Sequence, residues 1–473
     1  MRRRVRHYAQ RIQVVFFVNA SNYFIQREKE LLGDRFDALY AAADAPARGI
    51  TVNTLRMEPD KLAQQAGMAL RPSPFCKNSF LLEGDQKPGL HPYHHGGAFY
   101  VQEPSAASAA PLLEVEPGMK VADLCAAPGG KTSQLAAALG GQGLLLANEY
   151  DSRRAQILKS NLERMGVANA VITNEDTGRL AAAFPGFFDR VLVDAPCSGE
   201  GMFRKEPQAV DQHCEGLVRH CAQLAAEILD NAAAMVAPGG MLVLSTCTFS
   251  PEEDEGQAAA FLARHPEFSL LDCPGDFGAP GEENRCGGLP LDVSKVRRIW
   301  PCQGGEGHFM ARMQKAGQRQ QATGSAPSRK KAGRPPKPCP EWESFCKSLF
   351  PDLPATGPAV LAGDTVWLLP AVELPPHKLR VLRSGVMAGT VQKGRFVPAH
   401  QLFMVFGALC ANREELTLAD PRTAAWLRGE EIQAQTAQNG WCAVLVDGVP
   451  VGFGKKSGEK IKNHYPKALR NLK

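Results

Sequence analysis

The clearest pattern lies between residues 119 and 313, where short apolar runs alternate with helix-like stretches. The runs KVADLC, GLLLANE, NAVIT, DRVLVDA and MLVLSTC have the length and the branched side chains typical of buried strands. The stretches between them, including 132–139, 152–165 and 217–236, favour helices, and glycine or proline follows the first and the last of these. This alternation predicts an α/β fold, in which helices cover both faces of a mostly parallel sheet.

The pattern changes on both sides of this region. Residues 316–340 are poor in large apolar side chains and rich in Gly, Pro, Ser and basic residues, which predicts a solvated linker. Residues 341–473 carry short β-prone runs broken by turns and predict a small α+β module. We therefore divide the rest of the chain into an ill-ordered extension (1–24), a small N-terminal α+β module (25–115) and the α/β domain (116–315).

Composition narrows the possible environments and partners. Lys and Arg outnumber Asp and Glu by 54 to 49, so an acidic partner would meet local basic patches rather than a uniformly cationic surface. The 13 cysteines form no CxxC pair and are too sparse for a disulfide scaffold, so free thiols in a reducing cytoplasm are expected. The apolar run 14–18 is far shorter than the roughly 20 residues that cross a bilayer, and no membrane partner is expected.

The sequence DLCAAPGGKT, residues 123–132, joins the first predicted strand to a helix through a turn of small residues. Ligands of parallel sheets bind at the carboxyl ends of the strands, and Pro128-Gly129-Gly130 would let the backbone approach a ligand closely. Neither GxGxxG nor GxxxxGK[ST] is present, which argues against nicotinamide dinucleotides and nucleoside triphosphates. Glu149 after the second strand could bind ribose hydroxyls, and Asp176 after the third could accept an adenine amine. Each acid alone could also be a solvated strand end.

Two cysteines follow the fourth and fifth predicted strands. DAPCSGEGMFRKEP places Cys197 after one strand and STCTFSPEEDE places Cys247 after the other, so both thiols are predicted at one edge of the sheet. A lone buried cysteine is usually an inert apolar residue, but two beside a nucleoside site require a chemical explanation. Ser250 to Glu253 match a capping box. A helix beginning there would favour the thiolate of Cys247, which is therefore the predicted nucleophile.

These segments resemble the successive motifs of the NOL1/NOP2/Sun (RsmB/NOP) family of RNA cytosine-5 methyltransferases, which use S-adenosylmethionine. The resemblance rests on DLCAAPGGKT, NEYDSRR, DAPCSGEGMFRKEP and STCTFSPEEDE, with HHGGAFYVQEPSA upstream and RIWPCQGGEGHFMARM downstream. The closing VDGVPVGFGKKSGEKIKNHYPKALR is similar to the C-terminal module of the bacterial branch that acts on 16S ribosomal RNA. The resemblance implies a Rossmann-like class I methyltransferase domain between an RNA-binding N-terminal module and a PUA-like RNA-binding C-terminal module.

The resemblance also implies roles for individual residues. Cys247 would add to cytosine C6 so that C5 can accept a methyl group, and Cys197 would assist release as a base or through a water. Asp194 would contact the N3/N4 edge of the base, and Lys131 would stabilise developing charge. Family members often have Ser where this chain has Thr248, a mild departure. The implied cofactor contacts are Cys125, Ala126, Ala127, Pro128, Gly129, Gly130, Lys131, Glu149, Asp176 and Asp194.

Basic residues gather at the end of the chain. Residues 455–473 hold seven basic side chains and one acid, Glu459, with two rings among them. Contacts to phosphates and bases could supply the few kcal/mol that it costs to extrude a cytosine from its stack. A solvated basic tail is the alternative. The residues predicted to contact RNA are Lys455, Lys456, Lys460, Lys462, His464, Tyr465 and Lys467.

A histidine cluster precedes the α/β domain. His91, His94 and His95 have no cysteine or acid at ligand spacing, so contacts with RNA or with the core are expected and no metal is. Phe99-Tyr100 is more typical of a core than of a base-stacking platform.

The sequence as a whole predicts a monomeric enzyme that forms 5-methylcytosine in RNA, with 16S rRNA or the small ribosomal subunit as its partner. A tRNA cytosine-5 methyltransferase would share the catalytic residues, so that alternative stays open. A noncatalytic RNA-binding ribosome-assembly factor would be expected to have lost Cys247, Cys197 or the Pro-Gly-Gly turn, and all three are present.

Overall fold

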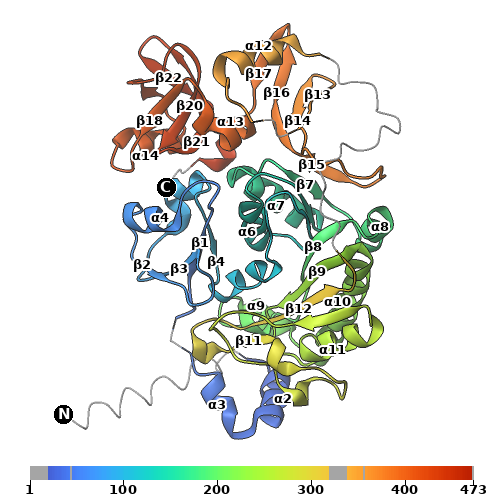
Figure 1. The fold of residues 1–473 in the computed structure, drawn as a ribbon. Coiled ribbons are helices and arrows are strands. Elements are labelled where there is room, and N and C mark those ends of the chain that lie inside the picture. Colours follow the sequence, from blue (N-terminus) through green and yellow to red (C-terminus); the bar gives the residue numbers. More distant parts are fainter. Residues whose placement is uncertain (1–19, 43–44, 319–337, 355–356, 471–473) are drawn as a thin grey trace, which may run out of the picture.

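The computed structural model describes residues 20–42, 45–318, 338–354 and 357–470 (Figure 1). The predicted extension 1–24 falls largely outside these residues, although Ser21 already caps a helix, α2 (Asn22–Leu32). Most of the predicted linker also falls outside them. The described chain resumes just before α12 (Pro340–Leu349).

A nine-stranded sheet forms the centre of the molecule, and its parallel core confirms the predicted α/β fold. Five strands run parallel in the order β7-β6-β5-β8-β9. Beyond β9, β12 pairs antiparallel with β9, and β10 pairs antiparallel with β12. The carboxyl ends of the five parallel strands therefore meet at one edge. The strands are β5 (Lys120–Asp123), β6 (Leu144–Asn148), β7 (Ala170–Thr173), β8 (Phe188–Asp194), β9 (Val236–Thr246), β10 (Phe268–Leu271), β11 (Arg297–Ile299), β12 (His308–Lys315) and β15 (Val381–Ser384).

Apolar side chains fill both faces of this sheet. Val121 and Leu145 contribute to one core with α6 and α7, whereas Ala122 and Leu146 contribute to another with α8, α10 and α11. Burial on both faces explains why these strands are continuously apolar rather than alternating. The helices are α6 (Gly130–Leu139), α7 (Ser152–Arg164), α8 (Thr177–Ala183), α10 (Glu215–Met235) and α11 (Glu255–Arg264).

The N-terminal module is a four-stranded antiparallel sheet in the order β2-β3-β1-β4. The helices α2 and α3 (Phe36–Leu39) pack instead on the α/β domain, in a cluster with Phe203, Phe249 and Trp300. Figure 1 shows them at the end of the molecule that also holds α9 (Pro207–Gln212) and β11. The other elements of the module are β1 (Gly49–Val52), α4 (Pro59–Gln65), β2 (Leu70–Pro72), β3 (Ser79–Leu82), α5 (Pro92–His95) and β4 (Phe99–Gln102).

The C-terminal part contains two sheets. The first is antiparallel, β13-β14-β16-β17, and the second has the order β18-β20-β21-β22-β19 with a parallel β18–β20 pair. β15, from the same part of the chain, joins the central sheet antiparallel to β7. The elements are β13 (Ala359–Ala362), β14 (Thr365–Leu368), β16 (Val386–Gln392), β17 (Arg395–Pro398), α13 (His400–Phe406), β18 (Arg413–Leu416), α14 (Pro421–Arg428), β19 (Ile432–Gln433), β20 (Gly440–Val446), β21 (Val449–Ser457) and β22 (Lys460–Asn463).

The N-terminal sheet and the last sheet of the chain share one hydrophobic core. Ile50 and Phe99 belong to the same buried cluster as Trp426, Ile461 and Tyr465. Figure 1 shows the blue N-terminal module beside the red C-terminal module. Segments more than 300 residues apart in sequence therefore complete a single core.

Among the described residues, no helix is both long enough and apolar enough to pass through a bilayer.

Candidate active site

The turn between β5 and α6 lies at the carboxyl edge of the sheet and is fixed by its own neighbours. The Ala126 amide donates to Asn148 O at 2.8 Å, and Arg154 of α7 donates to Ala127 O at 2.7 Å. Asn161 of the same helix donates to Pro128 O at 2.8 Å. The turn is therefore held by β6 and α7, the elements that follow it in the chain.

One glycine of the turn packs closely against the N-terminal module. Gly129 adopts φ +115°, a conformation that favours glycine. A Cβ on Gly130 would instead collide with Gln102 Oε1 and lie 3.2 Å from Tyr100 Cε1. Gly130 thus makes room for β4 of the N-terminal module, and its contact with a cofactor stays a prediction.

Two carboxylates beside the turn keep buried oxygen atoms without hydrogen bonds. Glu149 Oε1 accepts from the Asp151 amide at 2.9 Å, while Oε2 accepts none and lies 3.5 Å from the Arg154 guanidinium. Asp123 Oδ2 accepts from Thr132 Oγ1 at 2.7 Å, while Oδ1 has no partner. Burial raises the pKa of Asp123 to about 7. Unsatisfied acceptors of this kind suit a ligand that brings hydroxyl or ammonium donors.

Asp176, also predicted to contact the cofactor, serves as the N-cap of α8. Its Oδ1 accepts from the Gly178 amide at 2.8 Å and the Arg179 amide at 3.3 Å, and the residue is exposed. The adjacent Glu175 is buried and binds Arg179 and the Arg380 amide. Asp176 stands at the correct sheet edge, and its contact with a cofactor stays a prediction.

The two predicted thiols meet at this edge. Cys197 follows β8 and Cys247 follows β9, and because these strands are parallel neighbours their Sγ atoms lie 3.4 Å apart. Both residues are partly exposed. The hydrogen bond with Cys247, and then burial, raise the pKa of Cys197 well above its usual value. The raised pKa favours the protonated form of Cys197.

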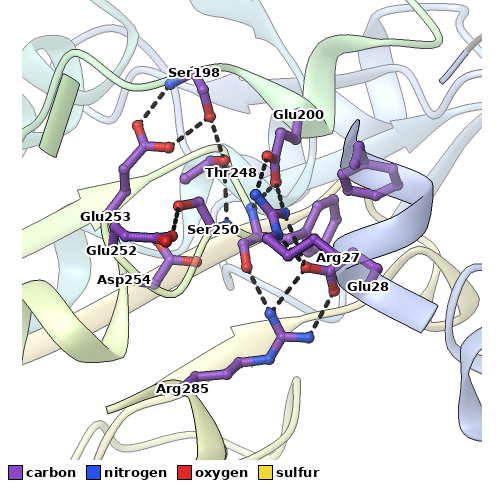
Figure 2. Close-up of polar contacts among 12 residues, drawn as sticks. Arg27, Glu28, Ser198, Glu200, Thr248, Ser250, Glu252, Glu253, Asp254 and Arg285 are labelled. Atoms are coloured by element: carbon purple, nitrogen blue, oxygen red, sulfur yellow. Dashed lines mark hydrogen bonds and ion pairs between the residues drawn. The ribbon is translucent and has the colours of Figure 1, made fainter. Parts of the chain in front are cut away.

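The helix predicted to begin at Pro251, with Ser250 as its N-cap, begins four residues later. α11 starts at Glu255, and residues 251–254 form turns. Ser250 Oγ donates to Glu252 Oε2 at 2.8 Å, and Glu253 accepts from the Ser198 amide (Figure 2). Ser198 lies in the loop after β8, and we call this loop and the loop after β9, which carry the two cysteines, the thiol loops. The predicted capping box is wrong because Glu253 binds across the site instead of closing on Ser250. The argument that placed a helix N-terminus beside Cys247 falls with it.

Lys131 and Asp194 form an ion pair beside the thiols. Lys131 Nζ donates to Asp194 Oδ2 at 2.8 Å, and Ser245 Oγ donates to Oδ1 at 2.6 Å. Burial opposes both charges, but the pair and its hydrogen bonds raise the pKa of Lys131 and lower that of Asp194. His308 is buried nearby, both of its ring nitrogens lack hydrogen-bond partners, and burial lowers its pKa to about 3. A neutral His308 was not anticipated from the sequence.

The sequence also gave no sign of a charged network that connects α2 to the thiol loops (Figure 2). Arg27 makes two hydrogen bonds of 2.8 Å to Glu200, whose Oε2 accepts from the Phe249 amide at 3.0 Å. The next residue, Glu28, pairs with Arg285, which donates to Phe249 O at 2.8 Å. Arg27 and Glu28 thus neutralise the two charged side chains that hydrogen bond to the amide and the carbonyl of Phe249, which lies two residues after Cys247.

The predicted RNA-contacting residues divide by exposure. Lys455, Lys460, Lys462 and Lys467 are exposed, and Lys456 is half-buried. The Lys455 ammonium lies 5.2 Å from the centre of the Trp441 ring, and His464 lies half-buried against the same ring. Tyr465 is only 3% exposed and hydrogen bonds to His95 Nδ1 at 2.9 Å. The prediction that Tyr465 stacks on RNA is wrong, because this ring fills the core shared with the N-terminal module.

The histidine cluster makes core contacts. His91 Nε2 lies 2.9 Å from Ala66 O, and His91 Nδ1 accepts from the Tyr93 amide at 3.1 Å. The neighbouring Phe99 is fully buried and Tyr100 nearly so. Within the described ranges, no three His, Cys, Asp or Glu side chains gather as metal ligands would.

Four family profiles match the chain in succession. Residues 21–104 match the N-terminal domain of 16S rRNA methyltransferase RsmF, and residues 110–314 match 16S rRNA methyltransferase RsmB/F. Residues 344–406 match the RsmF rRNA methyltransferase first C-terminal domain, and residues 413–471 match the methyltransferase RsmF PUA domain. The last two matches correspond to the two C-terminal sheets.

Individual relatives cover nearly the whole chain. Ribosomal RNA small subunit methyltransferase F of Cronobacter sakazakii is 32% identical, over 94% of this chain and 95% of that protein. The protein of the same name from Vibrio vulnificus is 33% identical, over 94% and 96%. A crystal structure of a methyltransferase homolog protein from Pyrococcus horikoshii is 29% identical with a TM-score of 0.55, over 62% of this chain and 94% of that chain. The structure of NSun6 from Pyrococcus horikoshii, 20% identical with a TM-score of 0.54, covers 63% and 99% and shares the fold.

Proposed function

Because the chain belongs to the RsmB/F family of 16S rRNA methyltransferases, we propose that it transfers a methyl group from S-adenosylmethionine to C5 of a cytosine in 16S rRNA. The observation that carries this proposal is the pair of sulfurs 3.4 Å apart at the carboxyl ends of β8 and β9. A single thiol suffices to activate cytosine, so a second one at contact distance favours a reaction that must also break the covalent intermediate.

The residues of the turn fit the proposed cofactor. Glu149 Oε2 and Asp123 Oδ1 are buried acceptors without hydrogen bonds. The ribose hydroxyls and the ammonium group of the cofactor could donate to them. The other proposed contacts are the turn from Cys125 to Lys131, Asp176 and Asp194. When bound, S-adenosylmethionine supplies a methyl group on a sulfonium, which is a strong electrophile.

Cys247 activates the cytosine in this mechanism. Its thiolate adds to C6, and the electron pair of the C5–C6 double bond makes C5 nucleophilic toward the methyl group. Lys131 and Asp194, joined at 2.8 Å, hold the polar edge of the base and stabilise the charge that develops on the ring. Afterwards Cys197 accepts the C5 proton directly or through a water. The C–H electron pair restores the double bond, and Cys247 leaves with the electrons of the S–C6 bond.

The shifted pKa of Cys197 explains the order of these steps. The hydrogen bond with the Cys247 sulfur is the first cause of the raised pKa, which favours the protonated form of Cys197 before the reaction. Once Cys247 has become a thioether, its sulfur can no longer hold a negative charge that would favour this proton. Cys197 can then give its proton to solvent water and, as the thiolate, accept the C5 proton in the release step, which comes second.

The rRNA contacts are proposed to extend over the C-terminal module. Residues 413–471 match a PUA domain, and their exposed lysines, Lys455, Lys460, Lys462 and Lys467, could bind phosphates. We also propose that the enzyme acts as a monomer in the cytoplasm, where ribosomal subunits are available.

Two experiments test the proposal. Cys197→Ala is expected to accumulate a covalent protein–RNA adduct that survives denaturing gels, while Cys247→Ala forms none; the reverse pattern would exchange the two roles.

Bisulfite sequencing of RNA from a deletion strain is expected to lose a signal in 16S rRNA. A signal lost only from tRNA would overturn the substrate, and no lost signal would favour a noncatalytic assembly factor.

A further inference from the structure

The residues that directly follow the two cysteines are hydrogen bonded to each other. Ser198 Oγ lies 2.8 Å from Thr248 Oγ1, although the two residues are 50 positions apart in the sequence. Both are buried, Ser198 to 4% exposure and Thr248 to 0%. The contact therefore joins the loop after β8 to the loop after β9 immediately behind the thiols.

Glu253 completes this contact from a third segment. Its Oε1 accepts from the Ser198 amide at 2.7 Å, and its Oε2 accepts from Ser198 Oγ at 2.6 Å (Figure 2). A serine hydroxyl has one proton, so when it donates to Glu253 its oxygen must accept from the Thr248 hydroxyl. The bonds therefore run in one direction, from Thr248 to Ser198 to Glu253.

We infer that Ser198, Thr248 and Glu253 form a clamp that positions the Cys197 thiol against Cys247 for the release of the product. This inference rests on the roles proposed above for the two thiols. None of the three clamp residues carries a reacting atom, so they are positioning residues. Their hydrogen bonds fix the peptide on the carboxyl side of each cysteine and thereby set the distance between the sulfurs.

The cost of burying Glu253 supports a role beyond stability. The carboxylate is 1% exposed and forms no ion pair among the described residues, and burial raises its pKa to about 7. Well-packed neutral residues usually stabilise such a position better than an ionised acid does. An acid that accepts both donors of one serine instead gives geometric precision to the loop that carries Cys197.

The clamp affects the two covalent steps differently. Addition to C6 requires only the Cys247 sulfur, whereas release requires the Cys197 sulfur at the correct distance from the adduct. Loosening the clamp should therefore slow release more than addition. A purely structural role would reduce both steps together or lower stability alone.

A matched pair of substitutions at Thr248 provides the test. Thr248→Val keeps the shape of the side chain and removes the hydroxyl, and Thr248→Ser keeps the hydroxyl. With RNA and S-adenosylmethionine, single-turnover experiments would follow formation of the adduct and its decay on denaturing gels. Thr248→Val is expected to form adduct within about threefold of the wild-type rate but to release it about tenfold more slowly, the loss typical of one buried hydrogen bond. Thr248→Ser should behave as wild type.

Other outcomes have definite meanings. Release at the wild-type rate in Thr248→Val, or equal slowing of both steps, would overturn the clamp. Absence of adduct in the Cys197→Ala reference would contradict the proposed chemistry instead. If Thr248→Val fails to fold, judged by its melting temperature and by S-adenosylmethionine binding, Glu253→Gln serves as the second variant. Glu253→Gln preserves the volume of the side chain and removes one of its two acceptors, so it should also slow release more than addition. Release at the wild-type rate in this variant would overturn the inference.

Discussion

The cofactor turn and the thiol pair lie at the same edge of one sheet but are held by different means. The turn is fixed by backbone and side-chain bonds from β6 and α7, its neighbours in sequence. The thiol loops are fixed by buried charges from distant segments, since Arg27 binds Glu200 across 173 positions and Glu28 binds Arg285 across 257. The binding half of the site thus depends on local structure, and the covalent half depends on the complete fold.

The largest effect is expected from removing the thiol that adds to the base, because this change should abolish the covalent chemistry and leave cofactor binding intact. Cys247→Ala should lower methyl transfer by about 10⁴-fold or more, because it removes the thiol proposed to add to C6. Affinity for S-adenosylmethionine, measured by calorimetry, should stay unchanged because Cys247 lies outside the turn between β5 and α6 that is proposed to hold the cofactor. Substantial activity in this variant would contradict the separation of the two halves.

Removing a distant charge should destabilise the whole protein. Arg27→Met leaves Glu200 buried and without its main counter-ion, which typically costs about 3 to 5 kcal/mol in the free energy of unfolding. The control is Arg35→Ala, because Arg35 is 59% exposed and its pair with Glu282 should contribute less than about 1 kcal/mol. Denaturant titrations would measure both, and equal losses would argue that α2 is only a surface element.

The buried acid of the clamp gives a pH-dependent effect. Burial raises the folded-state pKa of Glu253 from 4.5 to about 7, so its contribution to stability is complete below about pH 4.5 and is lost as the pH rises through about 7. Glu253→Gln should remove this loss and gain up to about 3 kcal/mol relative to wild type at pH 8. Denaturation of both proteins between pH 5 and pH 8 would measure the difference. A constant difference would contradict the shifted pKa.

A smaller effect is expected on the binding half. Arg154→Gln removes the donor to Ala127 O and the ion pair with Glu149, and should weaken S-adenosylmethionine binding by roughly tenfold. Adduct formation at saturating cofactor should be nearly normal. A defect in adduct formation alone would show that the two halves are coupled.

The smallest effect concerns the exposed lysines of the C-terminal module. Replacing Lys460 and Lys462 with Ala should weaken RNA binding and reduce the slope of log K against log salt by about one to two. S-adenosylmethionine affinity should not change. An unaltered slope would indicate a solvated tail.

The sequence predicted the local features of this comparison better than the distant ones. Strands and turns depend on short patterns, so the five parallel strands and the convergence of Cys197 with Cys247 could be predicted. Glu253 had the spacing of a capping box, but a partner 55 positions away, Ser198, binds it instead. Tyr465 was misinterpreted for the same reason, since its neighbours come from another module and no local pattern identifies them. β15 was missed because its pairing with β7 depends on tertiary contacts.

The core shared by the two ends of the chain has a consequence for synthesis on the ribosome. Ile50 and Phe99 are translated more than 300 residues before Trp426, Ile461 and Tyr465, which pack in the same core. The N-terminal sheet therefore keeps an exposed apolar face until those later residues have been translated. A product truncated before them would present this face to chaperones and proteases.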